Sequence, residues 1–370
     1  MPKHKGAKAA CSGKCNAPAS IANKNSTLIL VRVLIEILHP AHVHFFRNFI
    51  SDMELRGHEI SVAARDKDVT IELLNESGIG HAALSTQARG TIGLAKELVT
   101  RVRGLGRLIK DWRPDVLTGV MGPTIVLAGR RHRIPSVVFY DTELATRTNS
   151  WVFPLAGCVI TPDCYSRRVR GRHITYPGYQ ELAYLHPTRF QPDSERLARH
   201  DLTTTEPFTV VRFVAFHSSH DAREMSVPFD IRLEIIRRLE AVGRVVISSE
   251  SPLPRDLEPY RMAGQRSDLH HVMAYASAVI GESATMATEA ASLGVPAVFV
   301  GKTSRGYIDE LSDRYGLIVH RQPDDAVGIY DAIESVMTEP RSVWRDRRAQ
   351  MLADKTDVTS WMINWFEGGA

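Results

Sequence analysis

The clearest chemical pattern in the sequence lies between Ala278 and Pro296. An apolar stretch ends at Gly281, small residues follow, and Glu289 comes about two helical turns later. If Gly281 ends a buried strand and Ser283 opens a helix, the free N–H groups and the helix dipole favour a phosphate at that point. Glu289 could then accept hydrogen bonds from the hydroxyls of a ribose. The same residues also fit an ordinary helix capped by Ser283, so the spacing alone leaves both interpretations open.

Three histidines, His39, His42 and His44, fall between the first expected strand and the first expected helix. This position is at the edge of the cleft in a doubly wound domain, where a histidine can act as a general base toward a hydroxyl group. A metal site is not expected, because His42 and His44 are two residues apart at a helix start and their side chains diverge. The alternative for this cluster is helix capping or a place at the sheet edge.

Charged and polar residues also follow two later strands of the expected fold. Asp141 and Glu143 come directly after one of them, where they could position hydroxyls, remove a proton or cap the next helix. Arg212, Ser218 and His220 lie at and after the first strand of the second half of the chain. They would face a phosphate or a sugar there, unless they belong to a solvated loop.

Short apolar runs alternate with longer helical patterns from residue 28 onward, which predicts parallel sheets covered by helices on both faces. The alternation stops at 177–207, which contains four prolines, and then restarts. The expected strands lie at 28–38, 58–64, 81–84, 115–119, 136–140, 158–161 and 173–176, and then at 209–213, 244–248, 278–281, 296–300 and 317–320.

This pattern predicts an α/β protein with two doubly wound Rossmann-like domains that face each other across a cleft, with ligands at the carboxyl ends of the strands. The expected organisation is a disordered basic tail at 1–27, an N-terminal domain at 28–176, a connection at 177–207, a C-terminal domain at 208–340 and C-terminal helices at 341–370.

The composition is that of a globular protein: 370 residues with 46 Lys and Arg, 42 Asp and Glu, and 44% hydrophobic residues. Five lysines and no acidic residue lie in residues 1–26, so the rest of the chain, with 41 basic and 42 acidic residues, is nearly neutral. A nucleic-acid partner is therefore not expected.

Several other classes of site are also not expected. The four cysteines are scattered, and Cys11 and Cys15 have no second pair of ligands nearby, which argues against a disulfide framework and a metal site. The sequence contains no Walker motif and no Gly-x-Gly-x-x-Gly, so neither nucleoside triphosphate hydrolysis nor a dinucleotide cofactor is predicted. Without a run of 18 apolar residues or a signal-peptide pattern, the protein is predicted to be cytoplasmic.

The segment at 92–112 combines basic and apolar residues at helical spacing. Such a helix either packs on a sheet with a solvated basic face or lies on an anionic membrane surface. A peripheral contact with a membrane is therefore among the expectations, while the oligomeric state is not indicated.

The segment at 278–296 resembles the nucleotide-sugar signature of GT-B proteins, in which small residues at a helix start precede Glu-Ala-x-x-Leu-Gly-x-Pro. The hydrolysing UDP-N-acetylglucosamine 2-epimerases and the N-acetylglucosaminyltransferase that forms lipid II share this outline. The resemblance implies that Glu289 holds the ribose of a nucleotide sugar. The residues that match the diphosphate-binding helix start are Ser283, Ala284, Thr285 and Met286. Glu282 departs from the pattern, because many relatives have a small residue there and an acid would repel a diphosphate.

Over roughly residues 30 to 366 the chain is also similar to a family of GT-B-like proteins of archaea and bacteria known as domain of unknown function 354. The strings that carry this similarity include His39-Pro-Ala-His-Val-His-Phe-Phe46, Arg56-Gly-His-Glu59, Tyr140-Asp-Thr-Glu143, Ser219-His-Asp221 and Gly281-Glu-Ser-Ala-Thr-Met286.

The two resemblances imply a glycosyltransferase that moves a sugar from a nucleotide sugar, UDP-linked, to a glycan or lipid-linked acceptor without a metal or other cofactor. A histidine, either His42 or His44, or a carboxylate, either Asp141 or Glu143, would deprotonate the acceptor. A hydrolysing 2-epimerase is the first alternative, because Glu143-Leu-Ala-Thr-Arg147 is faintly similar to an epimerase segment. A non-catalytic protein that binds nucleotide sugars is the second.

Overall fold

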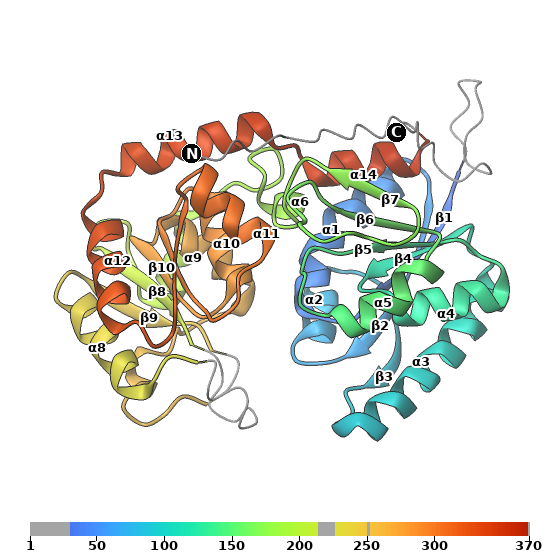
Figure 1. The fold of residues 1–370 in the computed structure, drawn as a ribbon, viewed down its shortest axis with the longest axis horizontal. Coiled ribbons are helices and arrows are strands. Elements are labelled where there is room, and N and C mark those ends of the chain that lie inside the picture. The colour runs from blue at the N-terminus through green and yellow to red at the C-terminus, as the bar shows by residue number, and fades with distance from the viewer. Residues whose placement is uncertain (1–29, 214–225, 250–251, 369–370) are drawn as a thin grey trace, which may run out of the picture.

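The computed structural model describes residues 30–213, 226–249 and 252–368, which form two α/β lobes side by side (Figure 1). The lobe that carries the first sheet is the N-lobe, and the lobe that carries the second sheet is the C-lobe. The expected tail at 1–27 lies outside the described residues, as do Ser218 and His220.

The sheet of the N-lobe has seven parallel strands in the order β3-β2-β1-β4-β5-β6-β7. Its interior strands are almost wholly buried, because helices cover both faces, which is the usual condition of a parallel sheet. The strands are β1 (Arg32–Ile37), β2 (Glu59–Asp66), β3 (Ala82–Thr86), β4 (Val116–Val120), β5 (Ser136–Phe139), β6 (Cys158–Pro162) and β7 (His173–Tyr176). The helices are α1 (Pro40–Leu55), α2 (Thr70–Glu76), α3 (Gly90–Trp112), α4 (Pro123–His132) and α5 (Thr146–Leu155).

Helix α1 begins directly after His39, the first residue of the histidine cluster. Pro40 takes a first-turn position, where its missing N–H costs nothing, and the Nδ1 of His39 accepts the N–H of Ala41 at 3.3 Å. Phe45 and Phe46 on the inner face are buried against the sheet. His39 is therefore a helix cap, one of the alternatives that the sequence left open.

The sheet of the C-lobe has five parallel strands in the order β12-β11-β10-β8-β9. Helix α6 (Leu182–Leu185) and the short helix η1 (Ser194–His200) connect the two lobes. The strands are β8 (Phe208–Arg212), β9 (Arg244–Ile247), β10 (Ala278–Gly281), β11 (Ala297–Val300) and β12 (Ile318–Arg321). The helices are α8 (Phe229–Glu240), α9 (Leu269–Tyr275), α10 (Ala284–Leu293), α11 (Gly306–Asp309) and α12 (Ala326–Thr338), with short turns η2 (Glu258–Tyr260), η3 (Arg266–Asp268) and η4 (Glu310–Arg314).

The chain crosses between the lobes a second time near its C-terminus. Helix α13 (Arg341–Asp354) lies along the top of the C-lobe in Figure 1, and α14 (Val358–Phe366) packs on the N-lobe against α1 and α6. The ring of Phe366 lies 5.1 Å from that of Phe49 in α1. The helices expected at 341–370 therefore join the two lobes.

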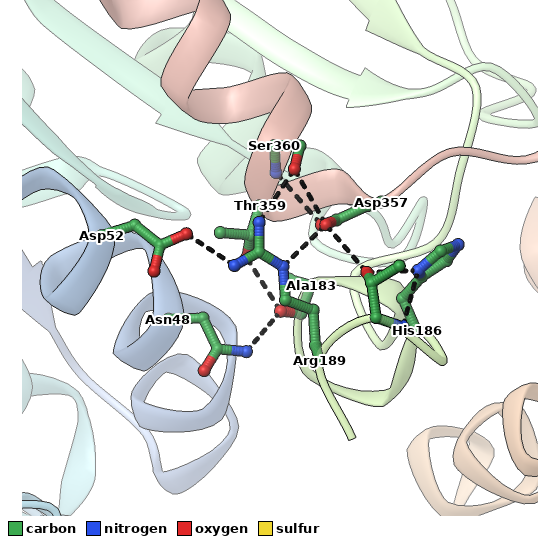
Figure 2. Close-up of polar contacts among 9 residues, drawn as sticks. Asn48, Asp52, Ala183, His186, Arg189, Asp357, Thr359 and Ser360 are labelled. Atoms are coloured by element: carbon green, nitrogen blue, oxygen red, sulfur yellow. Dashed lines mark hydrogen bonds and ion pairs between the residues drawn. The ribbon is translucent and has the colours of Figure 1, made fainter. Parts of the chain in front are cut away.

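Arg189 holds the first crossing against the second (Figure 2). Its guanidinium donates to Asp52 of α1 at 2.5 Å, to Asp357 at 2.6 Å and to Ser360 of α14 at 2.8 Å. One side chain thus ties α1, the interlobe connection and α14 together, with charge-assisted bonds that suit the planar fork of an arginine.

The structure confirms the predicted fold class of two parallel α/β halves. The domain boundaries stay predictions, although every strand of the first sheet falls within 28–176 and every strand of the second within 208–340. Strand β1 ends one residue earlier than expected, at Ile37, where the N–H of Leu38 bonds to the Nδ1 of His42 at 3.2 Å.

Gly281 offers a direct test of the turn that leads from β10 into α10. Its φ is +153°, and a Cβ at this position would overlap the carbonyl oxygen of Arg212 on the neighbouring strand β8. We expect Gly281→Ala to lower the free energy of unfolding by about 3 kcal/mol, from backbone strain and overpacking together. Urea unfolding measures this change. Gly80→Ala, where a Cβ would meet nothing within 4 Å, is the control and should change stability little; equal effects of the two substitutions would contradict the argument.

Candidate functional site

A cleft of about 470 Å³ opens between the lobes at the carboxyl ends of the N-lobe strands. The N-lobe contributes the loops after β1, β2, β4 and β5, and the C-lobe contributes the start of α10 and the loop before α11. The side chains used below are His42, Arg65, Lys67, Arg101, Asp141 and Glu181 from the N-lobe side and Ala284, Thr285 and Arg305 from the C-lobe.

The start of α10 faces this cleft. The side chain of Ser283 accepts the N–H of Met286 at 3.2 Å, which is a standard N-cap, and Ala284 and Thr285 line the cleft. Met286 itself is buried. The positive end of the helix dipole therefore points into the cleft, and a diphosphate at this position stays a prediction.

Glu282 is turned away from this space. One oxygen of its carboxylate accepts the N–H of Val227 at 2.6 Å, and the other lies 3.0 Å from the guanidinium of Arg232. Both side chains of this ion pair are almost fully buried. The unusual acid at the helix start is thus neutralised inside the C-lobe, and the repulsion expected from the sequence is removed.

Arg212 and His44 lie at a second hollow, of about 290 Å³, also formed by both lobes. The guanidinium of Arg212 donates to the carbonyl of Ser248 at 3.1 Å. The Nδ1 of His44 is buried and finds no hydrogen-bond partner among the residues that the structure describes. Burial, with the nearby His270 and Arg47, holds the pKa of His44 well below its ordinary value.

Glu289 lies beneath the cleft and contributes nothing to its lining. Its carboxylate accepts a hydrogen bond from the Tyr184 hydroxyl at 2.8 Å, and the Nε2 of His270 lies 2.8 Å from the same oxygen. Tyr184 comes from α6 of the interlobe connection, so this contact joins the two lobes. A ribose could reach Glu289 in the predicted way only if Tyr184 moved, which the sequence did not indicate.

His42 faces the cleft as a hydrogen-bond donor. Its Nδ1 accepts the N–H of Leu38 at 3.2 Å, so the neutral ring carries its proton on Nε2. Burial, together with His39 and Lys67, lowers the pKa of His42 to about 3. The general-base role that we expected for His42 does not suit this arrangement, because the nitrogen left for a ligand already holds a proton.

Asp141 and Glu143 are separated in role although they are two residues apart. Desolvation raises the pKa of Asp141 to about 6, with Arg305 opposing the shift and Glu143 adding to it. Glu143 is buried and accepts three donors: the N–H and hydroxyl of Ser166, at 3.0 and 3.1 Å, and the N–H of Gly306 at 3.3 Å. Asp141 is thus available to a ligand, whereas the carboxylate of Glu143 bonds the N-lobe to the C-lobe and is not placed to act as a base.

Glu181 is a cleft residue that the sequence analysis did not single out. It is 4% exposed and lines the same cleft as Asp141. Burial, with a contribution from Asp141, raises the pKa of Glu181 well above its ordinary value. It arrives through the interlobe connection, and no local spacing in the sequence signals such a placement.

One group of potential metal ligands occurs in the described part of the chain: Asp163, Cys164 and Glu310. The ammonium of Lys355 already lies between the two carboxylates, 2.8 Å from Asp163 and 2.7 Å from Glu310. The lysine supplies the positive charge that this cluster needs.

None of the helices described is long and apolar enough to cross a membrane.

Two parallel α/β sheets that face each other across a ligand-sized cleft define the GT-B fold, and solved structures share it. The UDP-GlcNAc 2-epimerase from Neisseria meningitidis, bound to UDP-GlcNAc, matches with a TM-score of 0.62 at 13% identity, over 91% of this chain and 99% of that chain. CalG4, the calicheamicin glycosyltransferase, matches with a TM-score of 0.58 at 15% identity, over 91% and 98%. At these identities the likeness shows the fold alone.

The chain belongs to the family described as protein of unknown function DUF354, whose model matches residues 31–363. This confirms the resemblance inferred from the sequence. The uncharacterized protein MJ0665 of Methanocaldococcus jannaschii is 24% identical over 287 residues, which cover 73% of this chain and 82% of that protein.

The raised pKa of Asp141 predicts a gain in stability when its charge is removed. The folded state holds the proton up to about pH 6 and the unfolded state loses it near the ordinary value of 3.8, so rising pH destabilises the fold across that window. We expect Asp141→Asn to be more stable than the wild type by about 3 kcal/mol at pH 8, with most of the difference gone by pH 4.

Urea unfolding at both pH values measures this difference. Asp111→Asn, at an exposed position of α3, is the control for the loss of one surface carboxylate. The argument would be contradicted if the stability gain of Asp141→Asn over the wild type were no larger at pH 8 than at pH 4.

Proposed function

We propose that this protein is a GT-B glycosyltransferase-like enzyme that uses a nucleotide sugar, UDP-linked, and transfers the sugar to a glycan or lipid-linked acceptor. The observation that carries the proposal is that the open N-terminus of α10 and the carboxyl of Asp141 line the same cleft. A site for an anionic leaving group and a group that can accept a proton are thus placed within reach of one ligand.

In the proposed reaction the diphosphate of the donor lies at the N–H groups of Ala284 and Thr285. The helix dipole and the nearby guanidinium of Arg305 stabilise the negative charge that develops on the leaving group, with no metal ion required. The nucleoside side of the donor extends toward Arg212 and the second hollow, while the sugar lies in the main cleft.

Asp141 is the proposed general base. A pKa of about 6 leaves its carboxylate ionised at neutral pH. Because this pKa is close to the working pH, the carboxylate can accept a proton efficiently. His42 donates from Nε2 to an oxygen of the sugar or phosphate, and Glu181, whose pKa is raised by burial, lines the same cleft. Glu143 and Glu289 act on the geometry of the site, through the other lobe, and not on the reacting atoms.

Two alternatives use the same cleft. A hydrolysing 2-epimerase would release an epimer of the monosaccharide without an acceptor. The UDP-GlcNAc 2-epimerase from Neisseria meningitidis has the same fold, which favours this alternative. A binding protein would hold a nucleotide sugar and turn over none. Product analysis without acceptor, and then with a panel of acceptors, separates the three.

Calorimetric titration with UDP and a panel of nucleotide sugars tests the donor site. We expect Thr285→Glu to weaken binding at least roughly tenfold, because a carboxylate at the helix start repels the diphosphate. Thr100→Glu, the same substitution at an exposed position of α3, is the matched control and should bind as the wild type does. Equal affinities of the two variants would place the diphosphate elsewhere and remove the main support of the proposal.

Helix α3 supports a further part of this proposal, a peripheral contact of a cytoplasmic protein with an anionic membrane. Its Ile92, Leu94 and Val99 are 72%, 47% and 46% exposed, and Lys96 lies exposed among them. The helix runs along the outer edge of the N-lobe, beside β3 (Figure 1). Apolar side chains flanked by cations suit the interface of an anionic bilayer.

We expect Ile92→Ser/Val99→Ser to weaken the affinity for phosphatidylglycerol-containing vesicles roughly tenfold, measured by co-sedimentation, because two apolar side chains on one side of the helix no longer enter the interface. The control is Leu55→Ser, at an apolar residue of α1 that is 84% exposed and far along the chain from α3. No vesicle binding by the wild type would show that the face of α3 is only solvated.

A further inference from the structure

The cleft has a positively charged end that the proposed reaction does not use. Arg65 and Lys67, at and after the end of β2, line it together with Arg101 from the middle of α3. We call these three residues the cationic end. Lys67 pairs with Asp68 at 3.0 Å.

Arg65 is committed to Glu97. Its Nε and Nη2 donate to the two carboxylate oxygens of Glu97 at 2.5 and 2.7 Å. The same carboxylate also accepts the hydroxyl of Ser85 at 2.9 Å and the N–H of Ala88 at 3.0 Å. Glu97 is thus saturated and has little capacity left for a second arginine.

Arg101 makes two long ion pairs within this network, and two of its nitrogens lack a hydrogen bond. Its side chain is 11% exposed, and it lies 3.8 Å from Glu97 and 3.5 Å from Glu36. Its Nε and Nη1 are buried without a hydrogen bond in the described part of the chain, and so are both carboxylate oxygens of Glu36. Burial raises the pKa of Glu36, and Arg101 opposes that shift. A buried guanidinium whose N–H groups lack hydrogen bonds is costly, and an anion beside Arg101 in the cleft would offset part of that cost.

The cationic end and Asp141 lie at opposite ends of one space. The sheet order β2-β1-β4-β5 separates the ends of β2 and β5 by three strand spacings, about 14 Å. His42, which follows β1, lies between them and offers a proton donor.

We propose that the cationic end binds an anionic group, a phosphate or a carboxylate, of the acceptor. This inference rests on the proposed function and names the class of acceptor: a sugar or glycolipid that carries a negative charge at one end and presents its hydroxyl to Asp141 at the other. Arg101 and Lys67 make the contacts with the anion, and Arg65 occupies both carboxylate oxygens of Glu97.

The probes for the test are inorganic phosphate, glucuronate as the carboxylate, and glucose as the uncharged control, titrated at constant ionic strength into the full chain. UDP is present at saturation so that the start of α10 is occupied. We expect phosphate or glucuronate to bind and glucose not to bind. A preference for phosphate indicates a phosphate-bearing acceptor, and a preference for glucuronate indicates a carboxylate-bearing one.

Two variants locate the site. We expect Lys67→Met to weaken anion binding about tenfold or more, and Arg101→Met to do the same in a Glu36→Gln background, which avoids leaving a buried carboxylate without its arginine. Glu36→Gln alone should bind the anion as well as the wild type. Arg107→Met, at an exposed position of α3, is the matched control and should change nothing.

Absence of binding by both anions, or binding that neither variant weakens, would overturn the inference. The affinity for UDP, measured on the same samples, separates the two proposals. If UDP binds and the anions do not, the proposed function stands and the acceptor class is wrong. If UDP does not bind, the proposed function fails. The anions are then titrated into Thr285→Glu, in which the start of α10 repels anions, with and without Lys67→Met. Anion binding that Lys67→Met weakens still supports the cationic end as an anion site, and binding that it does not weaken contradicts it.

Discussion

The geometry of the cleft depends on one hydrogen-bonded carboxylate between the lobes. Glu143, in the loop after β5, accepts the N–H of Gly306 at the start of α11. Gly306 leaves no room for a side chain, because a Cβ there would overlap the carbonyl of Cys164. This close approach brings Asp141, two residues before Glu143, toward Arg305, one residue before Gly306. The charge environment that sets the pKa of Asp141 is therefore a consequence of how the lobes are joined.

Other buried polar contacts across the lobes act in the same direction. Lys355 bridges Asp163 of the N-lobe and Glu310 of the C-lobe, and Glu310 also accepts the hydroxyl of Tyr179 at 2.6 Å. Such contacts add little net stability compared with apolar packing, but breaking one partner leaves the other buried without compensation. They favour one relative position of the lobes over many, and a cleft that must align a donor with an acceptor needs that selectivity.

The features that could be predicted from the sequence are the ones that depend on a few neighbouring residues. Strand β10, the cap at Ser283 and helix α10 were predicted almost residue for residue, because apolar periodicity and capping act over a few neighbours. Asp141 and Glu143 were predicted as a pair, but the docking of α11 gives them different environments. Glu181 was missed because it reaches the cleft through the interlobe connection.

Long-range packing also decides the role of residues that a motif places correctly. Glu289 occupies its expected helical position, yet its carboxylate accepts a hydrogen bond from the Tyr184 hydroxyl of α6, in the interlobe connection. A ribose hydroxyl offers the same chemistry as that tyrosine, a single O–H donor to a buried carboxylate. The motif thus retains its hydrogen-bonding logic while the bond closes the lobes. A nucleotide that reached Glu289 would have to exchange one donor for another, so donor binding and the separation of α6 from α10 would be linked through a single side chain.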